Sequence, residues 1–297
     1  MRKLQLFALS ALVISGLSAC TKTSVDPSSK YYDENDAEIK TYVSQTASLT
    51  GGTQATSGLY YKITQPNPTG KLATISDELE FRYKATNLKG QLVDSSAAAL
   101  PVYYPLGIGS LFPGLEQGVS LMREGEKAIF LMPSYLAYND RAQTNLPAYS
   151  VVRFDVTLNA SRTESQQIDA YIASRKLTVT ETTASGVRFI RTSPPVSATS
   201  AVPVTGQTLT IKYSGRQLRA ATAFDSTGTG TFDVVLGQNK FVKGFEEGLL
   251  KLKIGEKATI IFPSSLGYGK DGIVQTNRYV ITPYAPLRFD IELISAK

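Results

Sequence analysis

Histidine and tryptophan are absent from this 297-residue chain, and cysteine occurs once, as Cys20. Without histidine, neither a Ser-His-Asp triad nor a Cys-His pair can form. The same deficit excludes Cys/His zinc sites, and a single cysteine cannot form an intramolecular disulfide. A carboxylate-only metal site or a hydrolase with paired carboxylates is still compatible with the composition. Any chemistry must otherwise use Tyr, Asp, Glu, Lys, Arg, backbone groups or an apolar surface.

A dense stretch of charge of one sign is also lacking. The formal net charge is +6, and it falls to about +4 when Arg2 and Lys3 of a predicted leader are set aside. The remaining basic residues are scattered among acidic ones, and they form no basic stripe with interleaved aromatic residues. Nucleic acid is therefore not expected as a partner.

The N-terminus has the order of a signal peptide. In MRKLQLFALSALVISGLSAC, two basic residues precede an apolar run that ends in small residues. That run is shorter than the roughly 20 apolar residues that a membrane-spanning helix needs. The ending LSAC resembles the lipobox of bacterial lipoproteins, which implies a lipoprotein signal peptide over residues 1–19 and a lipid anchor on Cys20. The alternative is an ordinary secretory signal with an incidental cysteine.

The residues after Cys20 are polar, and we expect residues 20–35 to form a flexible tether. Thr21, rather than an acidic residue, follows the lipidated position. In well-studied Gram-negative sorting, this resembles an outer-membrane destination. The expected location is the cell envelope, with the chain lipid-anchored to the outer membrane, on either its periplasmic face or the cell surface.

The chain contains a long internal repeat. LGIGSLFPGLEQGVSLMREGEKAIFLMPSYLAYN at residues 106–139 aligns without a gap with LGQNKFVKGFEEGLLKLKIGEKATIIFPSSLGYG at residues 236–269. Thirteen of the thirty-three aligned positions from Leu106 to Tyr138 are identical, against roughly two expected by chance from average composition. A repeat of this length indicates a whole domain that occurs twice, and the chain is long enough for two domains of ordinary size.

Each copy has the pattern of a few helical turns among many short strands. Amphipathic spacing predicts a small helix at the start of each copy, over 36–43 and 165–173. Alternating or apolar runs predict strands over 78–83, 127–132 and 152–158, and over 208–213, 257–262 and 287–294. One further helix per copy is indicated by apolar residues at i, i+4 and i+7, namely Leu115, Val119 and Met122, then Phe245, Leu249 and Leu252. Gly125 and Gly255 are expected to end these helices.

These patterns predict an α+β fold, in which an antiparallel sheet packs on one helix in each copy. The expected division of the chain is a first domain over residues 36–160 and a second over residues 161–297.

The order of the elements resembles the FKBP-type peptidyl-prolyl cis-trans isomerases. The motifs are a strand with Tyr, a Phe-Asp turn, an LGxxxxxxGxEEG helix, a GEKxxxxxP strand, a YG loop and a final FDxEL strand. The resemblance covers about 72–159 and 205–297. Together with the lipobox and the small helices, it is similar to envelope FKBP-like lipoproteins of the Bacteroidetes type. It implies two FKBP-like domains, each a curved antiparallel β-sheet half-wrapped around a short α-helix, with no cofactor or metal.

In the second copy, the resemblance implies a nearly complete proline pocket. The catalytic residues would be Tyr213, Asp225 and Tyr268. The substrate-binding residues would be Phe224, Phe232, Phe241, Val242, Phe245, Ile281 and Phe289. In this scheme the aromatic rings hold the pyrrolidine, the Tyr268 hydroxyl donates to a substrate carbonyl, and Asp225 orients Tyr213. Each aromatic residue, taken singly, would more often be a core residue than a ligand contact.

In the first copy, the resemblance implies a weaker site. The matching residues are Tyr83, Asp94, Leu111, Phe112, Leu115, Tyr138, Leu146 and Phe154. Val93 and Val102 replace two aromatic walls, and Asn139 replaces the glycine after Tyr138. We therefore expect a wider, degenerate pocket here and place the activity mainly in the C-terminal domain.

The predicted function is peptidyl-prolyl cis-trans isomerisation by a folding helper for cell-envelope proteins. Its clients would be proline-containing unfolded or nascent envelope proteins. Rotation about the X-Pro bond needs no nucleophile or metal, which agrees with the lack of histidine. The alternative is a non-catalytic FKBP-like chaperone or peptide-binding module tethered to the envelope. A structural scaffold is the hypothesis with the least support.

Overall fold

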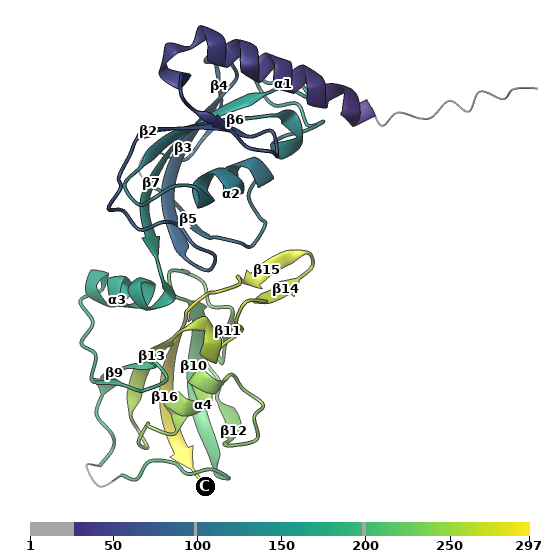
Figure 1. Cartoon of the computed structure of the whole chain (residues 1–297). Helices are drawn as coiled ribbons and strands as arrows, with labels where there is room; N and C mark the ends of the chain where they lie inside the picture. Colours follow the sequence, from purple (N-terminus) through teal and green to yellow (C-terminus); the bar gives the residue numbers. More distant parts are fainter. Residues whose placement is uncertain (1–26, 98–99, 198–199) are drawn as a thin grey trace, which may run out of the picture.

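Figure 1 shows the computed structural model, which describes residues 27–97, 100–197 and 200–297. Two domains follow each other along the chain and lie end to end, each with its own sheet (Figure 1). The predicted signal peptide and Cys20 lie outside the described residues. Within the described ranges, we find no helix with both the length and the apolar character needed to span a bilayer.

Domain 1 runs from residue 27 to residue 162 and is built on a seven-stranded antiparallel sheet. The strand order is β1-β2-β6-β7-β3-β4, and β5 pairs with β3. The helices are α1 (Pro27–Gln45) and α2 (Pro113–Ser120), with 3-10 turns at Ala47–Leu49 and Ser134–Leu136. The strands are β1 (Thr53–Gln54), β2 (Tyr60–Gln65), β3 (Glu78–Thr86), β4 (Leu92–Ser95), β5 (Val102–Pro105), β6 (Lys127–Met132) and β7 (Val152–Arg162).

Domain 2 repeats this plan from residue 164 to the end. The strand order is β11-β10-β16-β13-β9-β8, and β12 pairs with β10. The helices are α3 (Glu164–Ser174) and α4 (Lys243–Leu249), with a 3-10 turn at Ser264–Leu266. The strands are β8 (Glu181–Thr182), β9 (Arg188–Ser193), β10 (Thr208–Gln217), β11 (Asp225–Ser226), β12 (Phe232–Val235), β13 (Lys257–Phe262) and β16 (Leu287–Ala296). A separate hairpin consists of β14 (Ile273–Gln275) and β15 (Arg278–Ile281).

The two sheets have a register shift at equivalent positions. The β3–β7 pairing shifts register between Glu80 and Phe81, and the β10–β16 pairing shifts between Thr210 and Ile211. These positions are 130 residues apart, as are the sequence repeats. The predicted α+β fold, with an antiparallel sheet and a short central helix in each of two domains, is confirmed.

Both faces of each sheet are covered by apolar clusters, and the residues of β6 alternate between two of these clusters. Phe130 and Met132 belong to the large core under α2, whereas Ile129 and Leu131 belong to a second cluster with Ile39 of α1. Successive strand residues point to opposite faces, so a strand buried on both sides is apolar throughout. Domain 2 repeats this arrangement, with α4 on one face and α3 on the other (Figure 1).

Glycines let α2 and α4 lie close to the sheets. A Cβ on Gly118 would come within 2.5 Å of the Phe130 ring, and one on Gly248 within 2.4 Å of Ile260. A side chain at either position would force the helix or the facing side chain to shift, so glycine fits this close approach in both copies.

The glutamate of the GEK motif is buried and supports the turn after each helix. Glu126 accepts from the backbone N–H groups of Asn67 and Arg123, at 3.0 and 2.8 Å. Glu256 accepts from the Lys253 N–H at 2.9 Å and pairs with Arg191 at 2.8 Å. The motif therefore serves the fold in both copies rather than the pocket.

The predicted ends of the central helices are wrong. α2 ends at Ser120 and α4 at Leu249, so Gly125 and Gly255 lie several residues beyond them. Both glycines do have positive φ, 84° and 82°, but they form the turns that lead into β6 and β13. Met122 and Leu252 are buried just outside the helices, so apolar spacing overestimated the helix length.

The expected tether over residues 20–35 is also wrong in its last nine residues, because α1 begins at Pro27. Tyr31 stacks on Tyr149 with ring centroids 4.0 Å apart. Asn35 donates to the Tyr149 carbonyl and accepts from the Ser134 N–H. These contacts order the polar segment against domain 1. At the other end of this domain, Thr163 caps α3, so the junction lies slightly beyond residue 160.

Candidate functional site

An aromatic hollow of about 340 Å³ opens between α4 and the sheet of domain 2. It takes residues from β10, β11, β16, the start of α4 and the loop after β13. Eight of the ten residues predicted for this site line it: Tyr213, Phe224, Asp225, Phe241, Val242, Phe245, Tyr268 and Phe289.

The rings of this hollow form one connected cluster. Phe245 is the centre, with its centroid 4.9 Å from Phe289, 5.6 Å from Tyr213 and 5.7 Å from Phe241. Phe224 meets Phe289 edge to face at 5.7 Å. Tilted and edge-on pairs of this kind are the favoured arrangements of aromatic rings, so these contacts stabilise the walls of the hollow.

Gly215 on β10 makes room for two of these walls. A Cβ at this position would come within 2.6 Å of Phe289 and 2.9 Å of Phe224. In domain 1, Ala85 occupies the equivalent position on β3, and Val93 stands where domain 2 has Phe224. The glycine and the phenylalanine therefore form a matched pair that domain 1 lacks.

Polar groups lie at the rim of the hollow. The Tyr213 hydroxyl donates to Asp225 Oδ2 at 2.6 Å. Burial, and next the hydrogen bond to Asp225, raise the pKa of Tyr213. Burial, and then the Asp225 charge, also raise the pKa of Tyr268. Both hydroxyls are therefore protonated at neutral pH, and they can donate hydrogen bonds but not act as bases.

Two predicted residues lie outside the lining. Phe232 on β12 is 41% exposed, although its ring contacts Tyr213 and Phe241, each at 6.1 Å. Ile281 on β15 is buried in the domain core, with 1% exposure. Lys240, which the sequence reading missed, lines the hollow beside Phe241. The sequence signal that could have identified Lys240 is its position directly before Phe241, a predicted pocket residue.

Domain 1 has a hollow of about 410 Å³ at the equivalent place. Five of the eight residues predicted for the weaker site line it: Tyr83, Leu111, Phe112, Leu115 and Phe154. The sequence reading missed Arg141, whose guanidinium lies 5.9 Å from the Phe112 ring centroid. The larger volume agrees with the loss of two aromatic walls.

The other three predicted residues of domain 1 lie outside the lining of this hollow. Asp94 accepts from the Tyr83 hydroxyl at 2.8 Å, as Asp225 does from Tyr213. Tyr138 packs on Phe112 with centroids 4.6 Å apart, and burial raises its pKa. Leu146 is 1% exposed and belongs to the core. The polar pair is thus common to both domains, whereas the aromatic walls differ.

Comparison with known proteins places the chain in a family. The family model for FKBP-type peptidyl-prolyl cis-trans isomerase matches residues 70–159 and 200–294, which together exceed half of the chain. The chain belongs to the FKBP-type peptidyl-prolyl cis-trans isomerase family.

Individual relatives are similar over one or two domains. Peptidyl-prolyl cis-trans isomerase FKBP9 of Rattus norvegicus is 33% identical over 224 residues, which are 74% of this chain and 35% of that protein. FK506-binding protein 1B of Neurospora crassa is 37% identical over 105 residues, 33% of this chain and 89% of that protein. The chain therefore spans about a third of the length of the rat protein.

Among solved structures, FkpA from Escherichia coli matches with a TM-score of 0.39 and 26% identity, over 46% of this chain and 63% of that one. The three FKBP domains of wheat FKBP73 match with a TM-score of 0.37 and 20% identity, over 82% of this chain and 96% of that one.

Proposed function

We propose that domain 2 catalyses cis-trans isomerisation of X-Pro peptide bonds, and that the chain helps envelope proteins to fold. The observation that carries this proposal is the convergence of five aromatic rings with the Tyr213–Asp225 pair around one hollow. The barrier to X-Pro rotation is about 18–20 kcal/mol because rotation breaks amide resonance. A site that binds the twisted amide more tightly than the planar one lowers this barrier without covalent chemistry.

Each group then has a role that its geometry allows. Phe245 and Phe289 would hold the pyrrolidine ring by apolar contact. The Tyr268 hydroxyl would donate to a carbonyl of the substrate, because its raised pKa keeps the proton in place. Asp225 would fix the Tyr213 ring through their hydrogen bond rather than transfer a proton.

Variants of the full chain test this assignment, with domain 1 as the matched control. We expect Tyr268→Phe to lower the catalysed exchange rate by about tenfold, because one hydrogen bond contributes about 1–1.5 kcal/mol. Phe241→Ala should lower the rate as well, because it removes a wall of the hollow. The measurement is NMR exchange spectroscopy on a short proline peptide.

The equivalent changes in domain 1 are Tyr138→Phe and Leu111→Ala. We expect them to leave most of the rate intact. Equal losses from both sets would contradict the assignment to domain 2, and no acceleration by the unmodified chain would contradict catalysis altogether.

A peptide-binding role without turnover is the second candidate, and it fits domain 1. There Leu115 replaces the Phe245 ring, and Val102 replaces Phe232. A wide hollow with fewer rings would hold an unfolded segment loosely. Two linked sites would also raise the effective concentration of one client at the other site.

The envelope location rests on the N-terminal residues alone. The proposed clients are proline-containing unfolded or nascent envelope proteins, reached from a lipid anchor on Cys20. The lipobox hypothesis predicts that cells given a labelled fatty acid will label the chain. Cys20→Ser will then abolish both the label and the recovery of the chain with the membranes. Labelling of the Cys20→Ser chain would contradict the anchor, and a soluble unlabelled wild type would support the ordinary secretory signal.

A further inference from the structure

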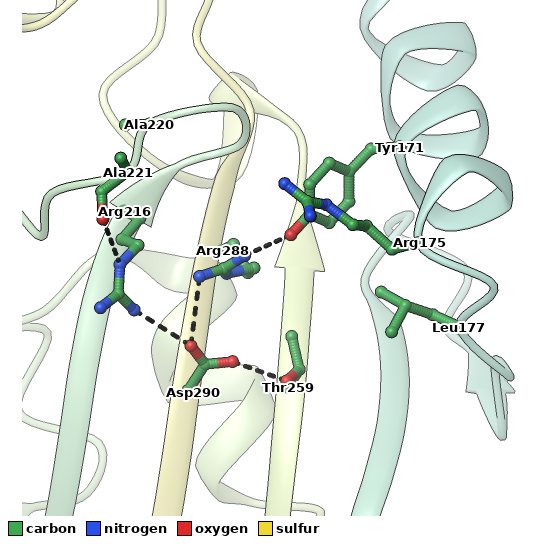
Figure 2. A pocket seen from close by; sticks show the side chains of 9 residues that line it. All are labelled: Tyr171, Arg175, Leu177, Arg216, Ala220, Ala221, Thr259, Arg288 and Asp290. Carbon is green, nitrogen blue, oxygen red and sulfur yellow. Dashed lines mark hydrogen bonds and ion pairs between the residues drawn. The ribbon is translucent and has the colours of Figure 1, made fainter.

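A second hollow of domain 2 lies on the face of the sheet opposite α4. Figure 2 shows its lining, which comes from α3 and the residues after it, β10, β13 and β16. Its volume is about 560 Å³, larger than that of the aromatic hollow. Strand alternation separates the two sites, since Phe289 faces the aromatic hollow while Arg288 and Asp290 face this one.

Three guanidinium groups line this hollow, with one carboxylate. Asp290 accepts from Arg216 Nη1 at 3.2 Å and lies 3.4 Å from Arg288 Nη2. The Thr259 hydroxyl donates to the same carboxylate at 2.6 Å. Arg175 lies over the Tyr171 ring at 5.8 Å, and no carboxylate of the described chain forms a salt bridge with it. The lining therefore carries an excess of two positive charges.

The Asp290 carboxylate does not satisfy the two arginines that share it. Arg288 donates from Nη1 to the Tyr171 hydroxyl, but its buried Nε has no acceptor among the described residues. Arg216 and Arg288 are only 24% and 19% exposed, so water screens their charges poorly. Partly buried guanidinium groups of this kind are strong donors to oxyanions.

Domain 1 provides an internal comparison at the same place. There each guanidinium nitrogen of Arg153 has an acceptor: Nε and Nη2 donate to Asp155 at 3.0 and 2.7 Å, and Nη1 donates to the Tyr42 hydroxyl at 3.2 Å. Thr86 stands where domain 2 has Arg216, as the strand pairing shows. Thr46 follows Tyr42 by four residues, as Arg175 follows Tyr171. One arginine and one aspartate balance each other there, so the excess charge is specific to domain 2.

We propose that this hollow binds a dianionic oxyanion of the phosphate type. Two uncompensated positive charges match a phosphate group, and the guanidinium groups come from three different elements, so they can donate to several oxygens at once. The volume exceeds that of a lone phosphate, and Leu177 and Ala220 offer apolar contact to whatever carries it. The site is separate from the aromatic hollow, so it does not depend on isomerase activity.

NMR of the ¹⁵N-labelled full chain tests the proposal through the arginine Nε–H signals. Inorganic phosphate and phenyl phosphate are the two probes, titrated at constant ionic strength with chloride as the balancing anion. We expect saturable shifts of the Arg216 and Arg288 signals, while the Arg153 signal stays in place. Tighter binding of phenyl phosphate would identify a phosphate ester as the ligand, and equal binding would identify free phosphate.

Charge-matched variants complete the test. Arg175→Gln combined with Arg216→Gln should weaken phosphate binding at least about tenfold, equivalent to about 1.4 kcal/mol. Lys84→Gln combined with Lys89→Gln removes two exposed charges from domain 1 and should leave binding unchanged. If the double arginine variant misfolds, Arg175→Gln alone, at an exposed position, serves instead. Non-saturable shifts, equal shifts of Arg153, or equal weakening by the lysine pair would overturn the proposal.

Discussion

A few side chains distinguish the two hollows, although the polar pair at the rim is the same. Tyr83–Asp94 and Tyr213–Asp225 have hydroxyl-to-carboxylate distances of 2.8 and 2.6 Å. The difference lies in Gly215 against Ala85 and in Phe224 against Val93, which act together because the glycine gives the ring its space. A substitution at either position alone would therefore not convert one site into the other.

The Tyr213 hydroxyl should contribute to stability in a pH-dependent way. Its folded pKa lies above the ordinary value of about 10, so its hydrogen bond to Asp225 is fully present below pH 10. The contribution is lost as the pH rises through the higher folded pKa, because the hydroxyl then ionises beside a carboxylate. We expect Tyr213→Phe to lower the free energy of unfolding of domain 2 by about 1 kcal/mol at pH 7.

Urea unfolding of wild type and variant at a series of pH values up to 11 measures this difference. We expect the gap between them to be constant up to pH 10 and to narrow above it. A gap that widens above pH 10, or none at pH 7, would show that this hydrogen bond does not stabilise the fold.

The sequence predicted the residues that line the hollow correctly where a motif determines both the helix or strand and the face on which the residue lies. Tyr213, Phe245 and Phe289 belong to a strand or helix with clear periodicity, and all three line the hollow. Phe232 and Ile281 lie on β12 and on the β14–β15 hairpin, at the edges of the domain. There the exposed fraction depends on neighbouring loops, which no local pattern describes.

At the scale of elements, strand bounds were more predictable than helix ends. β6 and β13 begin and end at the predicted residues. Their ends were predictable because a proline, which cannot continue the ladder, follows each strand. The central helices are shorter than predicted, since a turn with buried Met122 or Leu252 continues the apolar spacing without helical hydrogen bonds. α1 is longer than predicted because its first turns bind through tyrosine stacking rather than through an apolar stripe.

A network of hydrogen bonds around Asp77 should make the stability of domain 1 decrease in acid. Asp77, 2% exposed, precedes β3 and lies 2.7 Å from Lys71 Nζ, and it accepts from the Thr74 and Ser161 hydroxyls. Burial alone would raise the pKa of Asp77, but these hydrogen bonds outweigh burial and lower it. Domain 2 has Gln207 at the equivalent position and lacks this charged network.

We expect Asp77→Asn to destabilise domain 1 by about 1.5–3 kcal/mol at pH 7, the range for hydrogen bonds to a charged group. Because the folded pKa is lowered, the contribution of Asp77 is present above about pH 3.9 and is lost as the pH falls through the folded pKa. Denaturant unfolding at pH 7 and at pH 2 measures how much of this contribution is lost in acid. The exposed Asp140→Asn serves as the control, and a deficit that persists unchanged at pH 2 would contradict the charged network.

At the scale of the whole molecule, the two domains meet through an incompletely filled contact. A hollow of about 260 Å³ remains between them, lined by Glu78 and Tyr103 of domain 1 and by Arg219 and Tyr284 of domain 2. Interfaces of this kind leave relative domain motion as the default unless specific contacts oppose it. The relative orientation of the two hollows therefore depends on the side chains that bridge the domains.

Arg219 is the residue that should restrict this motion. It donates to both Glu78 oxygens, at 3.1 and 3.3 Å, and its guanidinium lies 4.7 Å from the Tyr103 ring centroid. Arg219→Ala removes the ion pair and the cation–π contact, each with an expected contribution of about 0.5–1 kcal/mol. We expect a larger radius of gyration by small-angle X-ray scattering, whereas Lys212→Ala, an exposed change on β10, should leave the radius unchanged. An unchanged radius for Arg219→Ala would mean that other contacts hold the domains in place, foremost the junction at Thr163, where β7 leads directly into α3.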